Sequence, residues 1–591
     1  MAMARSGYHG RVLKVNLTAG THEVEDLPEA IYRRYLGGGA LASYILLRDL
    51  PPGVDPLGPQ NMLVFMTSVI NGTAISGANR YTAAAKSPLS GGYGEAEAGG
   101  YWGPELKAAG YDGIIITGAA EKPVYLYIKD GQVEIRDAAP YWGKKATEVQ
   151  EALEADLNDR RIRVLQCGIG GERLVRYAAI VNQVRHFHGR AGLGAVMGSK
   201  RLKAIVVRGK EVPRPVDRPA AKGVLDWFRE NYDRENDGMH LFGTPRGIPS
   251  LQADGILPTR NFTQGNFEHF REISGQRMAE TMLVNRGTCF ACAVACKREV
   301  SVPEYGVEPK HGGMEYETIA ATGSLTGVGD LKKIARYSTL INEYVLDSIS
   351  TGMCIAWAQE CYERGILTKE DTGGLELTWG NQDVVETLIH QIALREGFGK
   401  LLGEGTYRAS KEIGRGTEEY TLTCKCQEFP MHEPRGKKSL ALAYSLSPTG
   451  ADHMEAPHDP AFEGFDVHDT SPLSAMGLIE PVDRLDLGPK KVRAFFYAQQ
   501  VWSAYNSIGM CDFVGIPIGA LYLQKLAEYV GAVTGWEFTL QELVKAGERA
   551  NTMSRLFNYR EGFTAADDTL PPRAFEGIGN GPLEGERIDP E

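Results

Sequence analysis

Three of the nine cysteines lie within eight residues, Cys289-Phe-Ala-Cys292-Ala-Val-Ala-Cys296, in the pattern C-x2-C-x3-C. Thiolates bind zinc and iron–sulfur clusters, and thiols also pair as disulfides. On a helix or a helical turn, residues i, i+3 and i+7 share one face, so the three sulfurs would converge on one object. The spacing therefore predicts a disulfide set, a zinc site or an iron–sulfur cluster.

The next ligand candidates favour the cluster. Zinc ribbons and fingers place a second ligand pair about 12–20 residues on, whereas here the next cysteine is Cys354 and the nearest histidine is His311. A [4Fe–4S] cluster needs four thiolates and accepts a distant fourth. Cys511 is favoured because Gly509 and Asp512 mark a break between helices. The full set of candidates for the fourth ligand is Cys167, Cys354, Cys361, Cys424, Cys426 and Cys511.

Carboxylates and histidines that could act as acids or bases follow the cysteines. Glu315 and Glu317 lie in Gly-Gly-Met-Glu-Tyr-Glu-Thr, and a pair of this kind is either a surface charge pair or a general base. His453 lies in Thr-Gly-Ala-Asp-His-Met, between residues that permit a close approach to a ligand. His432, in Pro-Met-His-Glu-Pro-Arg-Gly, is the second histidine candidate. A lone histidine is also compatible with a purely structural role.

Composition narrows the class of protein. The 591 residues are 43% hydrophobic and 24% charged, as in globular proteins. The net charge of -11 and a pI near 5.7 argue against nucleic-acid binding. No apolar run reaches the ~18–20 residues of a membrane span, and the first residues lack the apolar core of a secretory signal. Scattered cysteines, odd in number, suit a reducing compartment. The sequence predicts a cytoplasmic protein.

The first 211 residues are predicted to be β-rich. Residues 11–17 alternate at period two before a turn at 18–21, and residues 124–136 form a hairpin around Asp130-Gly131. Helices are expected at 29–50 and 146–157. Further inner strands are expected at 62–66, 113–117, 163–166 and 204–207.

A proline-rich connector at 212–219 is the clearest domain boundary, and a weaker one lies at 414–418. We expect an α+β fold: a β-rich domain at 1–211, then two mainly α-helical domains at 212–415 and 416–591. The helices expected after the connector are 220–236, 330–346, 353–364, 383–396, 401–412, 490–506 and 516–534.

Glycine is abundant, with 70 residues, many of them clustered in the first 200 positions. Such clusters indicate either tight turns or backbone that lies against a large ligand. Neither nucleotide-binding pattern is present. Arg173 replaces the last glycine of G-x-G-x-x-G, and residues 192–200 lack the order G-K-[ST].

Several stretches together resemble the tungsten-containing aldehyde:ferredoxin oxidoreductase family. The resemblance runs in order from about residue 8 to residue 560. It implies oxidation of aldehydes to carboxylic acids at a tungsten bis-pyranopterin, with molybdenum as a substitute metal, and transfer of the electrons through a [4Fe–4S] cluster to ferredoxin. The stretches are 76–80, 87–92, 98–113, 192–205, 315–318, 342–352, 450–453 and 506–511.

The resemblance also implies binding residues. It assigns Cys289, Cys292, Cys296 and Cys511 as ligands of the cluster. It assigns the binding of the pterins to the first domain. The family's two pterin motifs, D-x-x-G-L-[D/C], correspond to 342–347 and 506–511, with Asn at both leading positions and Val345 at the first glycine. Arg80 resembles an arginine between cluster and pterin. The backbone at Glu97, Gly99, Gly100, Gly189, Arg190, Ala191 and Gly192 resembles the segments on the pterin phosphates and their bridging Mg²⁺, and the pterin-motif residues are Asn342, Asp347, Asn506 and Met510.

The family places a catalytic glutamate in the 315–318 motif. We favour Glu315, with Glu317 as the competing register, and His453, with His432 as the runner-up. In this hypothesis Glu315 is the base toward water or the hydrated aldehyde, and His453 hydrogen-bonds the carbonyl oxygen.

Assembly and two rival functions remain to be weighed. The helix before Asn342 lacks the family's E-x-x-H, which predicts no iron bridge between subunits; oligomers through other surfaces, and small iron–sulfur or flavin subunits, stay open.

One rival is the tungsten subunit of a class II benzoyl-CoA reductase, with Cys354 as a thiolate ligand of the metal. The other, a cluster-only electron-transfer subunit, would not explain the pterin segments. Residues 232–275 and 456–485 match no motif and are candidates for lining the access path of the substrate.

Overall fold

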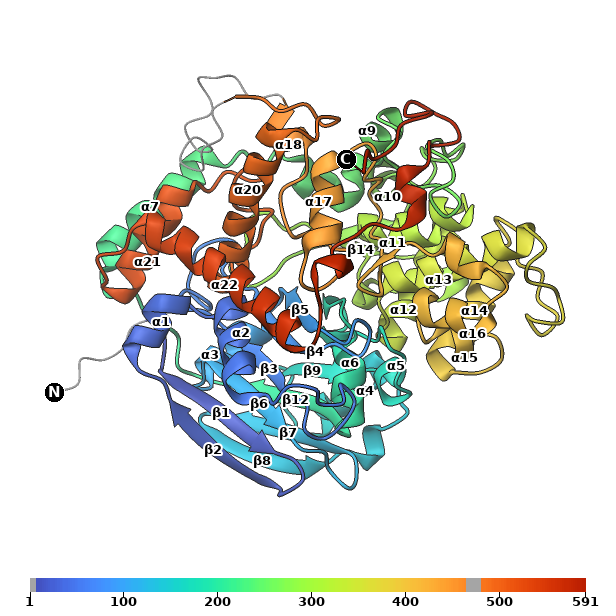
Figure 1. The fold of residues 1–591 in the computed structure, drawn as a ribbon. Helices are drawn as coiled ribbons and strands as arrows, with labels where there is room; N and C mark the ends of the chain where they lie inside the picture. The colour runs from blue at the N-terminus through green and yellow to red at the C-terminus, as the bar shows by residue number, and fades with distance from the viewer. Residues whose placement is uncertain (1–6, 464–479, 591) are drawn as a thin grey trace.

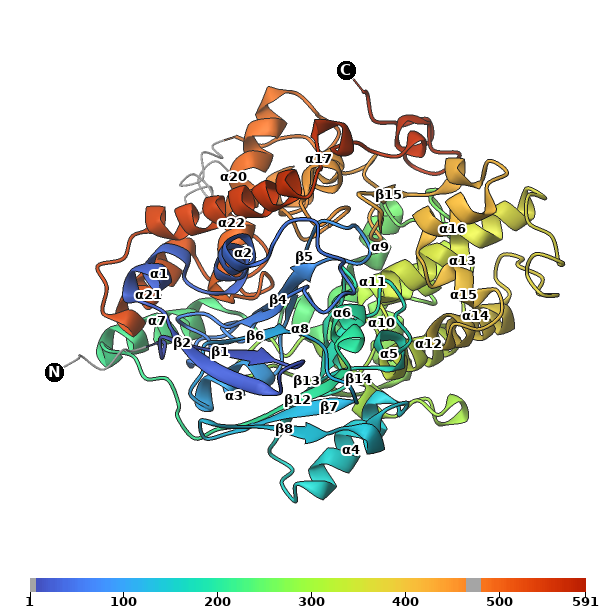
Figure 2. The same cartoon turned by 60° about the horizontal axis from the view of Figure 1, so that its bottom comes forward.

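A computed structural model describes residues 7–463 and 480–590 (Figure 1). Two six-stranded sheets lie together in the first part of the chain, and helices dominate the rest (Figures 1 and 2). The fold is α+β with a β-rich N-terminal region, as the sequence predicts. Within the described residues, no helix has both the length and the hydropathy needed to cross a membrane.

The first sheet has the strand order β2-β1-β6-β3-β4-β5. The predicted turn at 18–21 is confirmed, since β1 pairs antiparallel with β2. Strands β4 and β5 were not predicted, because alanine, glycine and glutamate dominate them and β-branched residues are almost absent. The strands are β1 Arg11–Asn16, β2 Thr21–Asp26, β3 Leu63–Met66, β4 Tyr81–Lys86, β5 Tyr93–Ala98 and β6 Gly113–Thr117.

The second sheet has the order β11-β10-β9-β12-β7-β8. Its β7–β8 hairpin is the predicted one, and Asp130 and Gly131 have φ of 47° and 81°, as a type I′ turn requires. The strands are β7 Val124–Lys129, β8 Gln132–Asp137, β9 Arg163–Cys167, β10 Ile180–Asn182, β11 His186–His188 and β12 Leu202–Arg208.

Six helices pack around the sheets. The helix predicted at 29–50 is broken in two, because Leu36 and Gly37 have φ of 63° and 129°, outside the helical range. The helices are α1 Glu29–Tyr35, α2 Gly38–Asp49, α3 Trp102–Ala108, α4 Ala146–Asp156, α5 Ile169–Glu172 and α6 Leu193–Ser199.

The proline-rich connector leads into the first long helix of the second part, α7, whose N-cap Asp217 accepts a hydrogen bond from Ala220 N. The helix predicted at 401–412 is split in two by a left-handed glycine, Gly405. The helices up to this point are α7 Arg218–Asn231, α8 Gly238–Phe242, α9 Ile248–Ala253, α10 Gly275–Thr281, α11 Tyr316–Thr322, α12 Leu331–Tyr344, α13 Ser348–Glu363, α14 Gln382–Leu394, α15 Gly399–Leu402 and α16 Thr406–Ile413. Short hairpins pair β13 Leu283–Gly287 with β14 Lys297–Val300, and β15 Thr423–Cys424 with β16 Gln427–Glu428.

The C-terminal helices pack back onto the first sheet (Figure 2). The 21-residue helix α22 was not predicted, and it packs against α20 and α2. A side chain at Gly547 would collide with the backbone of Gln500, so this glycine sets the close approach of α22 to α20. One apolar core joins residues of α2, β3, α20 and α22, so the packing crosses the predicted domain boundaries. These helices are α17 Lys438–Leu446, α18 Pro460–Glu463, α20 Pro489–Ile508, α21 Leu523–Thr534 and α22 Leu540–Arg560.

Candidate active site

The C-x2-C-x3-C motif forms a loop between β13 and β14. The prediction of a shared helical face is wrong, because Ala291 and Ala295 have φ of 51° and 49° and interrupt any helix. All nine cysteines are free thiols, so the motif is not a disulfide set in this structure.

Cys511 lies beside this loop. Its backbone N–H donates to Gly77 O at 3.0 Å, in the segment that leads to β4. Burial raises the pKa of Cys289 and Cys296 above its usual range and that of Cys292 to about 12, and the nearby Cys511 sulfur contributes in each case. Four neighbouring thiols in a desolvated site have the chemistry that an iron–sulfur cluster requires of its ligands.

Arg80 faces the same sulfurs. Its Nη2 is 3.6 Å from Cys511 Sγ, and its Nη1 is 3.8 Å from Asp512 Oδ2. Burial lowers the pKa of Arg80, but Cys511 and Asp512 raise it more, so the guanidinium stays charged. On the opposite side, a Cβ at Gly99 would lie 2.9 Å from Cys289 Sγ, so glycine permits the close approach of that backbone.

A cavity of about 800 Å³ adjoins the cysteines, near the upper end of the ~300–1,000 Å³ found for ligand sites. Six of the site residues predicted from the sequence are not part of the cavity wall: Gly100, Ala191, Gly192, Cys292, Asn506 and Met510. Both segments without a matched motif contribute to the wall, through residues such as Thr244 and Pro457, and residues 464–479 lie outside the described part. The predicted site residues in the wall are Arg80, Glu97, Gly99, Gly189, Arg190, Cys289, Cys296, Glu315, Asn342, Asp347, His453 and Cys511.

The two predicted pterin motifs are the C-terminal ends of α12 and α20, and both end in a Schellman turn. A left-handed residue follows each helix, Val345 with φ 57° and Gly509 with φ 68°. The weak sequence similarity of the two segments therefore reflects the same helix-ending backbone motif in both places. Its hydrogen bonds are Val345 N→Asn342 O (3.2 Å) and Leu346 N→Ile341 O (3.1 Å) in the first, and Gly509 N→Asn506 O (3.4 Å) and Met510 N→Tyr505 O (2.9 Å) in the second.

The side chains of the first motif are held in different ways. Asp347 caps α13 by accepting from Ile349 N, and its Oδ2 is 3.4 Å from Arg190 Nε. Burial raises the pKa of Asp347, and Arg190 opposes that rise. The Asn342 side chain donates to His311 O at 3.0 Å.

The two glycine-rich backbone segments lie side by side. Strand β5 packs against β11, and His188 Nδ1 is 2.8 Å from Ala96 O. Burial, with Glu95 nearby, raises the pKa of Glu97 well above its usual range. A Cβ at Gly189 would find only the Phe187 Cβ, 4.0 Å away, so its backbone is open to the cavity.

Glu315 belongs to the cysteine side of the cavity. Its Oε1 is 2.6 Å from Lys297 Nζ, and its Oε2 accepts from Thr244 Oγ1 at 2.6 Å. Burial alone would raise the pKa of Glu315, but Lys297 and Thr244 lower it below its usual value.

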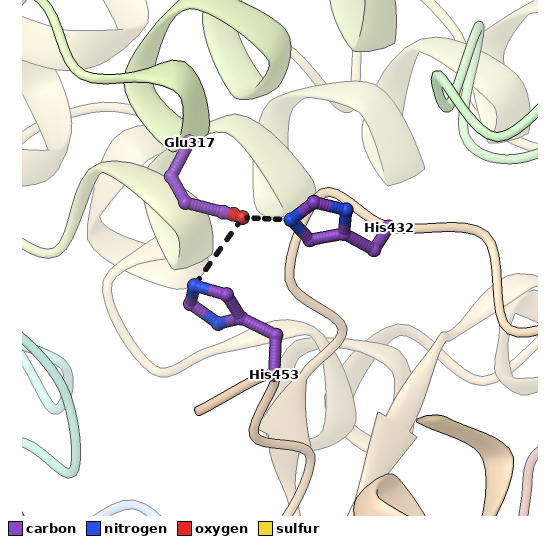
Figure 3. A group of neighbouring side chains, drawn as sticks. All are labelled: Glu317, His432 and His453. Atoms are coloured by element: carbon purple, nitrogen blue, oxygen red, sulfur yellow. Dashed lines mark ion pairs between the residues drawn. The ribbon is translucent and has the colours of Figure 1, made fainter. Parts of the chain in front are cut away.

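Glu317, in the first turn of α11, faces two histidines (Figure 3). Its Oε1 lies 3.2 Å from His432 Nε2 and 3.4 Å from His453 Nε2, and its Oε2 accepts from Met431 N at 2.8 Å. Glu315 and His453, the two residues favoured from the sequence, both line the cavity, and their catalytic roles stay a prediction. The structure pairs His453 with Glu317 and brings His432, the runner-up, to the same carboxylate.

Two histidines and a carboxylate are also a donor set for divalent metals, and these three residues converge closely enough to bind one. However, Lys437 Nζ is 3.2 Å from His432 Nδ1, and a buried ammonium beside a ligand opposes a dication. We therefore interpret the group as acid–base machinery.

Sequence reasoning missed several polar residues of the wall. Five that line the cavity are Arg185, His186, Lys297, Lys437 and His458. Lys297 follows Cys296 directly, so adjacency was an available signal for it. The others reach the cavity from loops and strand ends, and nothing in their local sequence predicts this.

Three of the four thiols line one large cavity together with a carboxylate and two imidazoles, a combination typical of an oxidoreductase that carries a metal centre. Two family models match the chain. The first, for the aldehyde ferredoxin oxidoreductase N-terminal domain, matches residues 12–209, and the second, for domains 2 and 3 of the same enzyme, matches residues 220–591. The chain belongs to the aldehyde ferredoxin oxidoreductase family.

Relatives are similar in sequence to this chain over nearly its full length. A tungsten-containing aldehyde ferredoxin oxidoreductase of Pyrococcus abyssi is 38% identical over 96% of this chain and 92% of its own. The enzyme of the same name from Pyrococcus furiosus is 36% identical over 98% and 94%. Among solved structures, the active-site complex of a benzoyl coenzyme A reductase with 1,5-dienoyl-CoA superposes with a TM-score of 0.85, at 27% identity, over 96% of this chain and 91% of that one.

The family implies a tungsten–pterin cofactor, and the residues present fit one. The open Gly189 backbone and several cations suit phosphate groups. Asp512 is 1% exposed, and its Oδ1 has no hydrogen-bond partner, as expected of an acceptor that awaits an N–H donor. The cations in the wall are Arg80, Arg185, Arg190, Arg246, Lys297, Arg298 and Lys437.

Proposed function

We propose that the protein oxidises aldehydes to carboxylic acids at a tungsten bis-pyranopterin in this cavity and passes the electrons through a [4Fe–4S] cluster to ferredoxin or a ferredoxin-like iron–sulfur subunit. The observation that carries the proposal is that Glu317, with its two histidines, lines the same cavity as Arg80 and three of the four proposed ligand cysteines. Family membership and the names of the relatives support it.

The cofactors would be held as follows. Arg80 would lie between cluster and pterin, the two Schellman turns would hold the pterins, and the backbone at Glu97–Gly100 and Gly189–Gly192 would carry the phosphates with a bridging Mg²⁺. When bound, the tungsten accepts the two electrons of the aldehyde and the cluster passes them on singly. The cluster ligands would be Cys289, Cys292, Cys296 and Cys511, and the pterin-motif residues Asn342, Asp347, Asn506 and Met510.

We assign the base to Glu317 rather than Glu315. A base must exchange protons with substrate, and Glu315 is locked to Lys297 by charge. Glu317 takes a proton from water, whose oxygen then attacks the carbonyl carbon, or from a hydroxyl group of the aldehyde that is already hydrated. His453, also at the cavity wall, donates a hydrogen bond to the carbonyl oxygen as negative charge builds there. Aldehyde and water thus give carboxylic acid, two protons and two electrons.

A second candidate is a reductase of the benzoyl-CoA type, which the structural similarity favours. That function would use Cys354 as a thiolate ligand of the metal. Here Cys354 is fully buried in α13 and is not part of the cavity wall, and burial raises its pKa well above the usual range. These observations weigh against a metal-bound Cys354.

The test combines elemental analysis with two assays. We expect tungsten or molybdenum together with iron and sulfide, and reduction of a viologen by benzaldehyde or acetaldehyde. Dearomatisation of benzoyl-CoA without aldehyde oxidation would favour the second candidate. Iron and sulfide alone would contradict both functions and indicate an electron-transfer subunit.

Three further assignments complete the proposal. A cytoplasmic location fits the free cysteines. We retain the division into 1–211, 212–415 and 416–591. We also propose subunits without a bridging iron, because the segment 333–343 of α12 contains no histidine. A stoichiometric mononuclear iron would contradict this last assignment.

A further inference from the structure

Lys437 is a buried cation that the proposed chemistry does not use. The residue is 3% exposed and lies just before α17. Its Nζ is 3.2 Å from His432 Nδ1 and also 3.2 Å from His458 Nδ1. One ammonium thus joins His432, a member of the acid–base group, to His458.

The donor character of the ammonium fixes both rings. An ammonium only donates hydrogen bonds, so the Nδ1 atoms of His432 and His458 must accept. Burial lowers the pKa of both histidines well below the usual value, and Lys437 adds to the effect. Each ring is therefore neutral, with a single N–H, which must be at Nε2.

Those two N–H groups point at the reaction site. His432 Nε2 faces Glu317 Oε1 at 3.2 Å, so the N–H that Lys437 places on this nitrogen lies beside the carboxylate. His458 Nε2 donates to His453 O at 2.9 Å and so fixes the backbone of the other catalytic residue. Both members of the proposed catalytic pair are thereby positioned from one point.

We propose that Lys437 is a positioning residue that fixes the tautomers of His432 and His458, keeps Glu317 as an ionised base and anchors His453. The inference rests on the proposed function. It adds a residue that reaches the substrate only through others.

The charges around Lys437 are consistent with this role. Burial lowers the pKa of Lys437 to about 8, which leaves it charged at pH 7. At that pH its charge favours the carboxylate of Glu317. The groups that face Lys437 are His432, His458, Asp459, Glu317, Asp254 and Arg484, and Asp459 is itself paired with Lys491.

Two variants of the holoenzyme separate charge from tautomer. K437M removes both charge and donors, whereas K437Q removes the charge but retains N–H donors. The acidic limb of kcat/KM for aldehyde oxidation is expected to move up by about one pH unit in both variants, because protonation of Glu317 becomes easier. The plateau value of kcat should fall about tenfold only in K437M, since only there can His432 adopt the other tautomer.

K438M is the matched control. Lys438 is the next residue, and its Nζ pairs with Glu586 at 3.7 Å, away from the histidines. K438M should keep the wild-type pH profile. An unshifted acidic limb in tungsten-loaded K437M would overturn the proposal, and so would a K437Q plateau as low as that of K437M.

An infrared titration makes the inference testable without turnover. The carboxyl band of Glu317, assigned by difference against E317Q, should appear at higher pH in K437M than in wild type, with or without bound cofactor. An unchanged titration would overturn the role of Lys437. A loaded wild-type enzyme that does not oxidise aldehydes would instead contradict the proposed function, and the infrared result would still decide the role of Lys437.

Discussion

Glu315 and Glu317 are two residues apart in the chain but belong to two different regions of the cavity. Glu315 is bonded to Lys297, next to Cys296, on the side of the thiols. Glu317 lies 3.2 Å from His432 and 3.4 Å from His453, on the side of the histidines. The difference suggests that electrons and protons leave the reaction by separate routes through one wall.

The two carboxylates also differ in how firmly their charge is fixed. Lys297 lowers the pKa of Glu315 against the effect of burial, and Glu315 in turn raises that of Lys297. This pair is a permanent dipole beside the cysteines. Glu317 instead faces two imidazole rings and accepts a hydrogen bond from the backbone N–H of Met431.

Removing the fourth thiol should have the largest effect, because it breaks the electron side completely. In C511A the proposed cluster loses a ligand that comes from outside the β13–β14 loop. Iron content should fall by about four atoms per chain, and viologen-linked turnover should fall more than about a thousandfold. A variant with full iron content and activity would contradict the assignment of Cys511.

The glutamate pair tests the comparison directly. E317Q removes the base, and kcat should fall about 10²–10³-fold at unchanged tungsten content. E315Q is the matched control on the electron side: turnover should change only a few-fold, while the uncompensated Lys297 shifts the cluster potential to more positive values. Equal losses in both variants would contradict the separation of the two routes.

Substitution of the two histidines should reduce activity by different amounts. H453N removes the donor to the substrate oxygen, and kcat/KM should fall about thirtyfold. H432N removes a group that acts on Glu317 only, and the loss should be a few-fold, mainly as a changed pH profile. A larger loss in H432N than in H453N would reverse the two roles.

The smallest effect concerns stability. Lys437 has a folded-state pKa of about 8, below the 10.5 expected when unfolded, so between these values the unfolded chain binds the proton more tightly. Lys437 therefore makes the free energy of unfolding of the wild type increase as pH rises, and this increase is absent in K437M. From pH 7 to 9.5 the difference should move in favour of the wild type by up to about 2 kcal/mol. Thermal melts of both proteins at the two pH values measure it, and a constant difference would contradict the lowered pKa.

Local patterns were enough to predict part of the fold. The hairpin around Asp130-Gly131 follows from turn chemistry, and helices such as α12 follow from apolar periodicity. Strand β5 and helix α22 were missed for different reasons. The first is too rich in glutamate and alanine to look like a strand, and the second is rich in charged residues and owes its place to packing on α20.

The candidate site depends more on tertiary structure. Which of Glu315 and Glu317 meets the histidines is decided by where α11 begins, a detail of one or two residues that sequence patterns do not resolve. Lys437 was missed because its partners are brought to it by the loop that carries His458. The sequence therefore predicted the kinds of group in the site better than their pairing.

The position of Cys511 in the chain bears on how the enzyme is made. The other three thiols are synthesised early, on one short hairpin loop, while the fourth follows the last residue of α20. A nascent chain that stops before this point offers only three of the four proposed ligands, together with a half-formed cavity. If Cys511 closes the cluster as we propose, insertion of the metal centres follows the synthesis of α20, and topology alone excludes a shorter product from maturation.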